Sequence, residues 1–463
     1  MAEMPPYDVA VIGGGNAALC AALTARQAGA SVVVLEAAPR EMRGGNSRHT
    51  RNLRCAHASP TEILTDAYLE REFLADLVKV GGAHEDEELA RMVVHRSAGC
   101  PDWMRQFGVR FQSSIRGTLH LGRTNAFFLG GGKAVMNSYY AAAERLGIEV
   151  RYRAEVVSLV LAGDECRGIA VNANGGTQPV HARAVVIASG GFESNLEWLR
   201  EAWGQAADNF IVRGTPYNQG RVLKLLLDAG AQSVGDPRGC HAVAVDARAP
   251  KFDGGIVTRL DCVPLGIVVN ARGDRFYDEG EDFWPKRYAV WGRLVAEQPD
   301  QIAWSIIDAK ARGRFIPSVF PPVVAETVPA LALALGLAPD RVERTVRAFN
   351  DAVVPGRFDH AVLDGCRTRG LPIEKTHWAQ PIDTPPYYGY PLRPGITFTY
   401  LGLKVDRASR VIMQDGRPLK NVHAAGEIMA GNVLRQGYIA GVGMTIGTVF
   451  GRLAGESAAQ HAH

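Results

Sequence analysis

A glycine-rich turn near the start of the chain has the residues needed to bind the phosphates of a dinucleotide. Residues 13–18 read Gly-Gly-Gly-Asn-Ala-Ala, the pattern G-x-G-x-x-A, directly after the apolar stretch Asp8–Ile12. In this pattern Gly13 allows a tight turn, Gly15 lets the backbone approach a pyrophosphate, and Ala18 keeps helix and strand close. The free N–H groups and the positive dipole at the start of the following helix would attract the phosphates.

The elements expected around this turn are those that dinucleotide binding requires. Asp8–Ile12 is predicted to be a buried strand, an Ala- and Leu-rich helix follows to about Gly29, and a second strand, Ser31–Leu35, ends beside Glu36. Glu36 is placed to accept both hydroxyls of an adenosine ribose, and no arginine directly after it favours a 2′-phosphate. The alternative is a glycine-rich turn in an unrelated α/β protein.

Later segments favour FAD over NAD. Arg43-Gly44-Gly45-Asn46-Ser47 suits a loop that passes the isoalloxazine ring. Two predicted strands far apart in the sequence run into small residues, one at Ser189-Gly190-Gly191 and one at Ala425-Gly426-Glu427. Such strands let a flavoprotein return repeatedly to one extended dinucleotide.

The glycine-rich segment Gly437–Gly447 opens a helix that is predicted to run to about Ala459. Its free N–H groups could face the pyrimidine end of a flavin and stabilise negative charge in the reduced state. The alternative is a helix of small residues that packs closely on a neighbour.

Composition excludes several classes of protein. The 463 residues suggest two to three domains, and 51 basic against 48 acidic residues leave a charge of +3, too little for a nucleic-acid surface. No apolar run approaches the roughly 18 residues that span a bilayer, and we predict no signal peptide. The seven cysteines form no C-x-x-C pair, which argues against an iron–sulfur cluster, an attached haem or a structural zinc. We therefore predict a reduced cytoplasmic enzyme without a metal site.

The chain resembles the flavoprotein subunits of the fumarate reductase/succinate dehydrogenase family, and most closely their tricarballylate dehydrogenase branch. The segments Gly13–Cys20, Gly44–Arg54, Asn270–Phe276 and Leu434–Tyr438 carry the resemblance. It implies an α/β fold in which a Rossmann-like FAD-binding domain, residues 1–237 and 398–463, is interrupted by a smaller α+β capping domain, residues 238–397. In the cap, Ala338–Val353 is predicted to be a helix, and the Pro-rich stretches near 317–329 and 381–394 are predicted to be loops or a hinge.

The resemblance also implies the cofactor site. Asn46 falls where some relatives attach FAD through a histidine, so non-covalent FAD is expected, and His49 is either a pocket residue or a surface histidine. The implied cofactor-binding residues are Gly13, Gly15, Asn16, Ala17, Ala18, Glu36, Ala37, Gly44, Gly45, Asn46, Ser47, Gly132, Val156, Ser189, Gly190, Gly426, Glu427, Gly441, Thr445 and Ile446.

The implied reaction removes a hydride and a proton from adjacent saturated carbons flanked by carboxylates. Cations must then neutralise a carboxylate as it becomes enolate-like, a task that suits arginine. The implied catalytic residues are the carboxylate-clamping Arg435, the proton-shuttling Arg287 and the carboxylate-binding His241. Longer spacing than in fumarate reductases leaves Lys286 or Tyr288 as alternatives to Arg287.

The implied substrate-binding residues are Thr258, Arg259, Thr397, Gly437 and Tyr438. Three positions depart from the family: Arg259 replaces a glutamate, Cys262 an arginine of the proton relay, and Thr397 a histidine. These changes predict a more positive pocket that suits a tricarboxylate and lacks the relay feeding protons to fumarate.

We therefore predict an FAD-dependent dehydrogenase that oxidises a saturated polycarboxylate, with tricarballylate going to cis-aconitate. Without a cluster or haem of its own, the chain would pass electrons to a separate iron–sulfur or haem protein at the inner membrane; direct reoxidation by oxygen is the competing route. The alternatives are a flavoprotein of cobalamin ring contraction, a fumarate reductase-like or 3-ketosteroid dehydrogenase-like enzyme, and simple flavin carriage.

Overall fold

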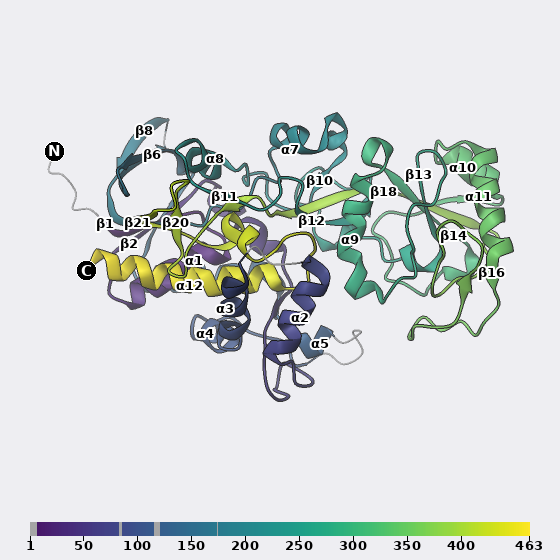
Figure 1. Ribbon diagram of the computed structural model, residues 1–463, viewed down its shortest axis with the longest axis horizontal. Helices are drawn as coiled ribbons and strands as arrows, with labels where there is room; N and C mark the ends of the chain where they lie inside the picture. Colours follow the sequence, from purple (N-terminus) through teal and green to yellow (C-terminus); the bar gives the residue numbers. More distant parts are fainter. Residues whose placement is uncertain (1–6, 83–85, 115–120, 174) are drawn as a thin grey trace. The chain divides into compact units, whose positions relative to one another are not determined.

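The computed structural model (Figure 1) describes residues 7–82, 86–114, 121–173 and 175–463 and has a mixed α/β fold. The chain divides into two compact units, each built from separate segments. The first contains Met1–Trp198, Gly214–Cys240 and Phe398–His463, and the second contains Leu199–Arg213 and His241–Thr397. None of the helices in the described ranges is long and apolar enough to cross a membrane.

A six-stranded sheet forms the centre of the first unit, with the strand order β20-β21-β9-β1-β2-β5. All of its pairings are parallel except that of β20 with β21. The strands are β1 (Tyr7–Ile12), β2 (Val32–Glu36), β5 (Glu149–Tyr152), β9 (Ala182–Ile187), β20 (Arg410–Ile412) and β21 (Pro418–Ala424). The neighbours β2 and β9 flank β1, so the carboxyl ends of these three strands meet at one edge of the sheet.

The predicted strands and helix at the start of the chain are confirmed as β1, α1 (Asn16–Gln27) and β2. The predicted C-terminal helix is confirmed as α12 (Val442–Ala462), which runs alongside α1 (Figure 1). Gly447, Gly451 and Gly455 recur every four residues along α12 and therefore share one face. A Cβ at Gly451 would lie 2.5 Å from Ala17 O, and one at Gly455 would lie 2.4 Å from Ala21 O. The two helices therefore approach so closely that this face admits only glycine.

The remaining elements of the first unit surround the sheet. They include a three-stranded antiparallel sheet of β6 (Glu155–Ala162), β7 (Glu165–Ala173) and β8 (Gly176–Val180). The strands β3 (Asn52–Arg54) and β4 (Asn125–Phe127) form a separate antiparallel pair. The longer helices are α2 (Glu70–Gly81), α3 (Glu87–Ser97), α6 (Gly131–Arg145) and α8 (Arg221–Asp228).

The second unit is built around the long strand β18 (Tyr387–Thr399), of which residues 387–397 belong to this unit. It pairs antiparallel with β14 (Ala303–Ile307) and β15 (Val323–Ala325), and parallel with β10 (Ile211–Val212). The strand β13 (Ile267–Asn270) extends the sheet, and β12 (Cys240–Asp246) pairs with β18. The helices α10 (Val328–Ala334) and α11 (Pro339–Ala352) pack their apolar residues against this sheet, and α9 (Trp284–Ala296) lies in the same unit.

The predicted helix near 338–353 is confirmed as α11, but the prediction of a loop throughout 381–394 is wrong. Residues from Tyr387 onward belong to β18 although the strand contains Pro391 and Pro394. Proline lacks an N–H but still accepts, and the carbonyl of Pro391 accepts from Ala247 N at 2.9 Å. The stretch 317–329 likewise contains β15 and the start of α10.

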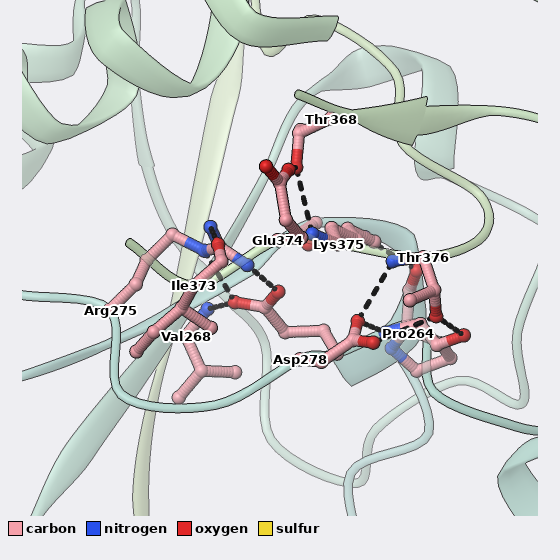
Figure 2. A network of polar contacts seen from close by, with 12 residues as sticks. Pro264, Val268, Arg275, Asp278, Thr368, Ile373, Glu374, Lys375 and Thr376 are labelled. Atoms are coloured by element: carbon pink, nitrogen blue, oxygen red, sulfur yellow. Dashed lines mark hydrogen bonds and ion pairs between the residues drawn. The ribbon is translucent and has the colours of Figure 1, made fainter. Parts of the chain in front are cut away.

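A buried polar network fixes the loop that leads to α9 (Figure 2). Lys375 is fully buried, and its Nζ donates to Pro264 O at 2.9 Å and to Gly266 O at 2.6 Å. Arg275 forms an ion pair of 2.6 Å with Glu279, which also accepts from Val268 N. Burial lowers the pKa of Lys375 to about 8, because a low-dielectric interior disfavours the charged amine.

We expect Gly451→Ala to lower stability by about 1–3 kcal/mol, because the new methyl group would push α12 away from α1. The matched control is Gly81→Ala in α2, where the added methyl group would have nothing within 4 Å and alanine improves helix propensity. Thermal unfolding of both variants provides the measurement. Equal unfolding midpoints would contradict close packing of the two helices.

The buried Lys375 predicts a stability that rises with pH. Between about pH 8 and pH 10.5 the unfolded chain binds the proton that the folded protein has already lost, so alkali favours the folded state. Lys375→Met should remove this rise and leave two carbonyls without their donor, lowering stability at neutral pH by about 1–3 kcal/mol. The check is the thermal midpoint at about pH 7.5 and pH 9.5, with Lys224→Met, an exposed position, as control. A variant with the pH slope of the parent protein would refute this account.

Candidate active site

The turn after β1 passes so close to two neighbouring strands that it requires glycine. Gly13 has φ +113°, and a Cβ there would lie 2.3 Å from Ala188 O, just beyond β9. A Cβ at Gly14 would lie 2.0 Å from Glu36 Oε2 and 2.3 Å from Tyr140 Oη. The turn thus brings the ends of β1, β2 and β9 together at the start of α1.

The carboxylate of Glu36 is buried beside this turn. It accepts from Ala38 N at 2.9 Å and from Gly44 N at 3.4 Å. Tyr140, on α6, donates to Gly14 O at 2.8 Å and lies 3.5 Å from Glu36 Oε2. Burial raises the pKa of Glu36, while its backbone donors oppose that shift. Sequence reasoning missed Gly14 and Tyr140, because their roles follow from spatial contacts with Glu36.

The loop Gly44–Ser47 closes over the start of α1. Gly44 and Gly45 both have positive φ, at 106° and 53°. Ser47 Oγ accepts from Asn16 N at 3.0 Å, and Gly15 supplies no side-chain cap to the helix. Gly132 of α6 packs against this loop, since a Cβ there would lie 2.1 Å from Ser47 O. These contacts bring together the four segments around residues 15, 36, 47 and 132.

The segments after β9 and β21 meet through two acidic side chains. Glu193 is fully buried and accepts from the amides of Asn46 and Asn218, while Glu427 is partly buried and accepts from Thr399 N at 2.8 Å. Gly190 has φ +77° and packs against the amide of Asn218. The predicted cofactor residues Asn46, Gly190 and Glu427 therefore lie in one connected network.

The N-terminus of α12 is partly used by the protein itself. Gly443 N donates to Tyr438 Oη at 3.1 Å, and Thr445 Oγ1 donates to Arg54 O at 2.6 Å. Gly441 has φ +83°, and a Cβ there would lie 2.7 Å from Arg54 N. We expected the N–H groups of this segment to face a flavin. One of them, that of Gly443, instead donates to the hydroxyl of Tyr438.

The other predicted cofactor residues lie on the same elements of the first unit. Asn16 donates to Met444 O at 3.2 Å and to Thr448 Oγ1 at 3.0 Å, linking α1 to α12. A Cβ at Gly426 would lie 2.7 Å from that of Ala17. Val156 follows Ala154, whose N–H donates to the Glu36 carbonyl at 3.0 Å. The remaining positions are Ala18 in α1, Ala37 beside Glu36, Ser189 beside Gly190, and Ile446 in α12.

These residues fit an extended dinucleotide. The start of α1 is preceded by a turn without side chains, and its N-cap residue Gly15 makes no side-chain hydrogen bond. The buried Glu36 lies at the end of β2, where it can bind ribose hydroxyls. In FAD the pyrophosphate would be held by backbone N–H groups at the start of α1, and the adenosine ribose by Glu36.

In the second unit, several predicted residues gather around Tyr288 of α9. The rings of His241 and Tyr288 meet edge to face with centroids 6.4 Å apart, and the guanidinium of Arg259 lies 4.7 Å from the Tyr288 ring centroid. Burial, assisted by the nearby Arg213, holds the pKa of His241 well below its usual range. The imidazole is therefore neutral at neutral pH, while Arg213 carries positive charge.

Arg213 was not predicted from the sequence. It is buried, it directly follows β10, and its N–H donates to Ile396 O at 2.8 Å, which ties it to β18. The available signal was an arginine placed directly after the apolar run Phe210-Ile211-Val212. Such a run predicts the end of a buried strand. Arginine is rarely buried there unless it has a structural or functional role.

The expectation that Arg259 makes its surroundings strongly positive needs correction. Arg259 bonds Asp261 through two nitrogens at 2.7 and 2.9 Å, and both side chains are nearly buried. Arg287 forms an ion pair with Glu281, which also accepts from Tyr277 Oη at 2.6 Å. Each arginine therefore has an acid that offsets its charge, and the acids were not considered in the sequence prediction.

The other predicted residues have different surroundings in the two units. Thr258 Oγ1 donates to Gly255 O at 3.0 Å, so its hydroxyl hydrogen is used locally. Thr397 lies near the end of β18 in the second unit. Burial raises the pKa of Cys262 to about 12, so this thiol cannot relay protons at neutral pH. In the first unit Arg435 is exposed, and Gly437 O accepts from Tyr400 Oη at 3.0 Å.

Comparisons with known proteins agree with the dinucleotide site. The model of the FAD binding domain family matches residues 8–443. A probable fumarate reductase of Shewanella frigidimarina is 26% identical, over 98% of this chain and 75% of its own length. The NADH:fumarate oxidoreductase of Klebsiella pneumoniae is 25% identical over 98% of this chain, which spans only 48% of that relative.

A solved structure shares the fold over the whole chain. The open conformation of a flavocytochrome c3 fumarate reductase has a TM-score of 0.76 at 22% identity, covering 100% of this chain and 79% of its own. Together with the family match, these similarities establish the cofactor and the class of enzyme. The chain belongs to the FAD binding domain family and is an FAD-dependent oxidoreductase.

Proposed function

We propose that this protein is a dehydrogenase of saturated polycarboxylates that oxidises tricarballylate to cis-aconitate with non-covalently bound FAD. One carbon of the substrate loses a hydride and the adjacent carbon loses a proton, which forms a C=C bond conjugated to a carboxylate. FAD supplies the acceptor for the hydride and its two electrons.

The observation that carries the proposal is the buried Arg213 beside the neutral His241 in the second unit. A guanidinium in a low-dielectric interior stabilises a carboxylate far more strongly than one in water. A neutral imidazole adds a hydrogen-bond donor that cannot repel the arginine. This pair suits a carboxylate whose negative charge grows as the neighbouring C–H bond breaks.

Other residues support the same chemistry. Arg435 is exposed and therefore accessible to a carboxylate ligand, and Tyr438 follows it in the same segment. The Arg287–Glu281 ion pair is the proposed proton acceptor, because a carboxylate behind a guanidinium can receive the proton that the arginine alone would not keep. Arg259 then acts with Asp261 as a neutral unit that orients Tyr288 and, through it, His241.

The electrons must leave FAD for an acceptor outside the described chain. The chain matches about half of the NADH:fumarate oxidoreductase, whose name couples the oxidation of NADH to the reduction of fumarate. We propose a separate iron–sulfur or haem protein as the acceptor, located at the cytoplasmic face of the inner membrane.

Anaerobic bleaching of the bound flavin tests the substrate class. We expect tricarballylate to bleach the oxidised enzyme faster than succinate does, and a 3-ketosteroid to leave it unchanged. Arg435→Ala should reduce kcat/KM for tricarballylate about 10- to 100-fold, because a charge-assisted hydrogen bond to the substrate is lost. Arg407→Ala, which alters an exposed arginine in the same unit, is the matched control.

A second series separates carboxylate recognition from charge alone. Arg435→Lys keeps the charge but removes the planar fork, so it should recover only part of the lost activity. Bleaching by none of the three compounds, or bleaching by tricarballylate that is equal in Arg435→Ala and the parent protein, would overturn the proposed substrate class.

The cofactor site has its own test, independent of substrate. Gly14→Ala places a methyl group 2.0 Å from Glu36 Oε2, so it should displace the acid and weaken FAD binding at least tenfold. Gly176→Ala, in open space at the start of β8, is the control. Titration of the apoprotein with FAD, followed by quenching of flavin fluorescence, gives the dissociation constants. Equal affinities would show that FAD binds elsewhere.

A further inference from the structure

A pocket lined mainly by cations lies in the first unit, between the segment 40–48 and helix α6. Its volume is about 360 Å³, within the range of sites for small ligands. The pocket opens to solvent, because Arg40, Glu41 and Lys133 are exposed. We call it the basic pocket, since one acid, Glu41, stands among four cations, Arg40, Arg43, Arg48 and Lys133.

None of these four cations forms an ion pair within the residues that the structure describes. Arg43 contacts two tyrosines: its Nη1 donates to Tyr152 Oη at 2.8 Å, and its guanidinium lies 4.2 Å from the Tyr140 ring centroid. Arg48 Nη1 lies 3.6 Å from the sulfur of Met42. None of these partners is a carboxylate, so they leave the positive charge of both guanidinium groups uncompensated.

The single acid of the basic pocket does not restore the balance. Glu41 forms an ion pair with Arg153 at 3.6 Å, so its charge is shared with a fifth cation that does not line the pocket. Four like charges in one concave surface repel one another and raise the local positive potential. An anion with several negative charges would relieve this repulsion.

The start of α6 strengthens the positive potential. Lys133 lies in the first turn of this helix, where the helix dipole is positive and acids are the favoured residues. The first turn contains no acid, and the N-cap residue Gly130 makes no side-chain hydrogen bond. Met136 and Asn137 follow Lys133 by three and four residues, so all three share one face of α6. That face gives the pocket a cation and an amide beside the positive end of a helix.

The loop Gly44–Ser47 separates the basic pocket from the start of α1. On the α1 side, the carbonyl oxygen of Gly44 lies 3.7 Å from the position that a Cβ on Gly15 would occupy. On the α6 side, a Cβ on Gly44 would lie 2.9 Å from Cγ of Met136, which lines the pocket. FAD held at the start of α1 would therefore leave the pocket accessible to a second ligand.

We propose that the basic pocket binds a small anion with several negative charges, a phosphate ester or a polycarboxylate, and that this anion strengthens FAD binding. Both kinds of anion present the pairs of oxygens that an arginine fork binds. The proposal concerns a site other than the one proposed for the substrate, and it does not depend on which substrate the enzyme oxidises.

The two arginines of the loop connect the pocket to the cofactor site. Arg43 directly precedes Gly44, whose N–H donates to the carboxylate of Glu36 at 3.4 Å. Arg48 directly follows Ser47, whose Oγ accepts from the N–H at the start of α1 at 3.0 Å. An anion bound to both arginines would hold both ends of the loop in place. FAD would then bind to a loop that is already ordered, and the coupling of the two ligands would be reciprocal.

Calorimetric titration of the FAD-loaded enzyme with inorganic diphosphate at low ionic strength tests the site. We expect saturable binding that Arg40→Gln and Lys133→Gln each weaken about three- to tenfold, because each removes one positive charge from the pocket. Arg145→Gln is the matched control, since this exposed arginine lies in the last turn of α6 and does not line the pocket. Arg435→Ala, which alters the proposed substrate site, should bind diphosphate as the parent protein does.

The same titration with citrate distinguishes the two kinds of anion, and it uses Arg435→Ala so that the proposed substrate site contributes little. Tighter binding of diphosphate than of citrate assigns the pocket to phosphate esters, and the reverse assigns it to polycarboxylates. In either case the affinity should fall when Arg40→Gln is added.

Titration of the apoprotein with FAD tests the coupling. Diphosphate should lower the dissociation constant of FAD about fivefold in the parent protein and have little effect when Arg40→Gln and Lys133→Gln are combined. Diphosphate that instead occupied the phosphate site of FAD would raise this constant by competition.

Three results would overturn the proposal: no saturable binding of diphosphate, equal affinities in the parent protein and the combined variant, or competition between diphosphate and FAD. Unfolding of the variants is not expected to confuse the outcome. Neither Arg40 nor Lys133 has a hydrogen bond or ion pair with the described residues, and removal of either charge relieves repulsion. Without the anion, the thermal midpoints of both variants should therefore equal or exceed that of the parent protein.

Discussion

The absence of side chains at Gly13 and Gly14 is the constraint on which the cofactor site depends. The backbone of Gly13 lies against Ala188, beyond β9, and that of Gly14 lies against the carboxylate of Glu36, at the end of β2. Three strand ends can converge on the start of α1 only because the turn adds no Cβ there. The same principle recurs at Gly191, which lets two acids meet, and along Gly447, Gly451 and Gly455, which let α12 lie against α1.

Much of the first unit could be predicted from the sequence because its signals are local. The G-x-G-x-x-A turn, the strands on either side and the acid at position 36 lie within 30 residues of one another, and each residue type has a steric or electrostatic reason to be there. Tyr140 and Glu193 have no such local signal. Their roles arise from contacts with residues more than 100 positions away, Tyr140 with Gly14 and Glu193 with Asn46.

The second unit shows why a count of charges is a poor guide to electrostatics. The substitution of arginine for an acid at position 259 suggested a positive surrounding, yet Asp261, two residues later, offsets it. Glu281 does the same for Arg287. Arg213 is more important for the proposed carboxylate binding than Arg259 or Arg287. Its position in the sequence nevertheless lies outside the predicted cap. The prolines led to a similar error, because they suggested a loop where the structure has a strand. A strand excludes proline only where its missing N–H would have to donate, and β18 therefore accommodates Pro391 and Pro394.

The connectivity of the second unit has a consequence for how the polypeptide can be dissected. It consists of Leu199–Arg213 and His241–Thr397, so the backbone enters and leaves it twice. Arg213, His241 and Thr397 are each the first or last residue of one of these segments. A simple truncation that isolated this unit would therefore cut the chain beside the groups of greatest interest and discard β10. A circular permutant with new ends in the exposed turn near Gly313 would instead keep all four junctions intact.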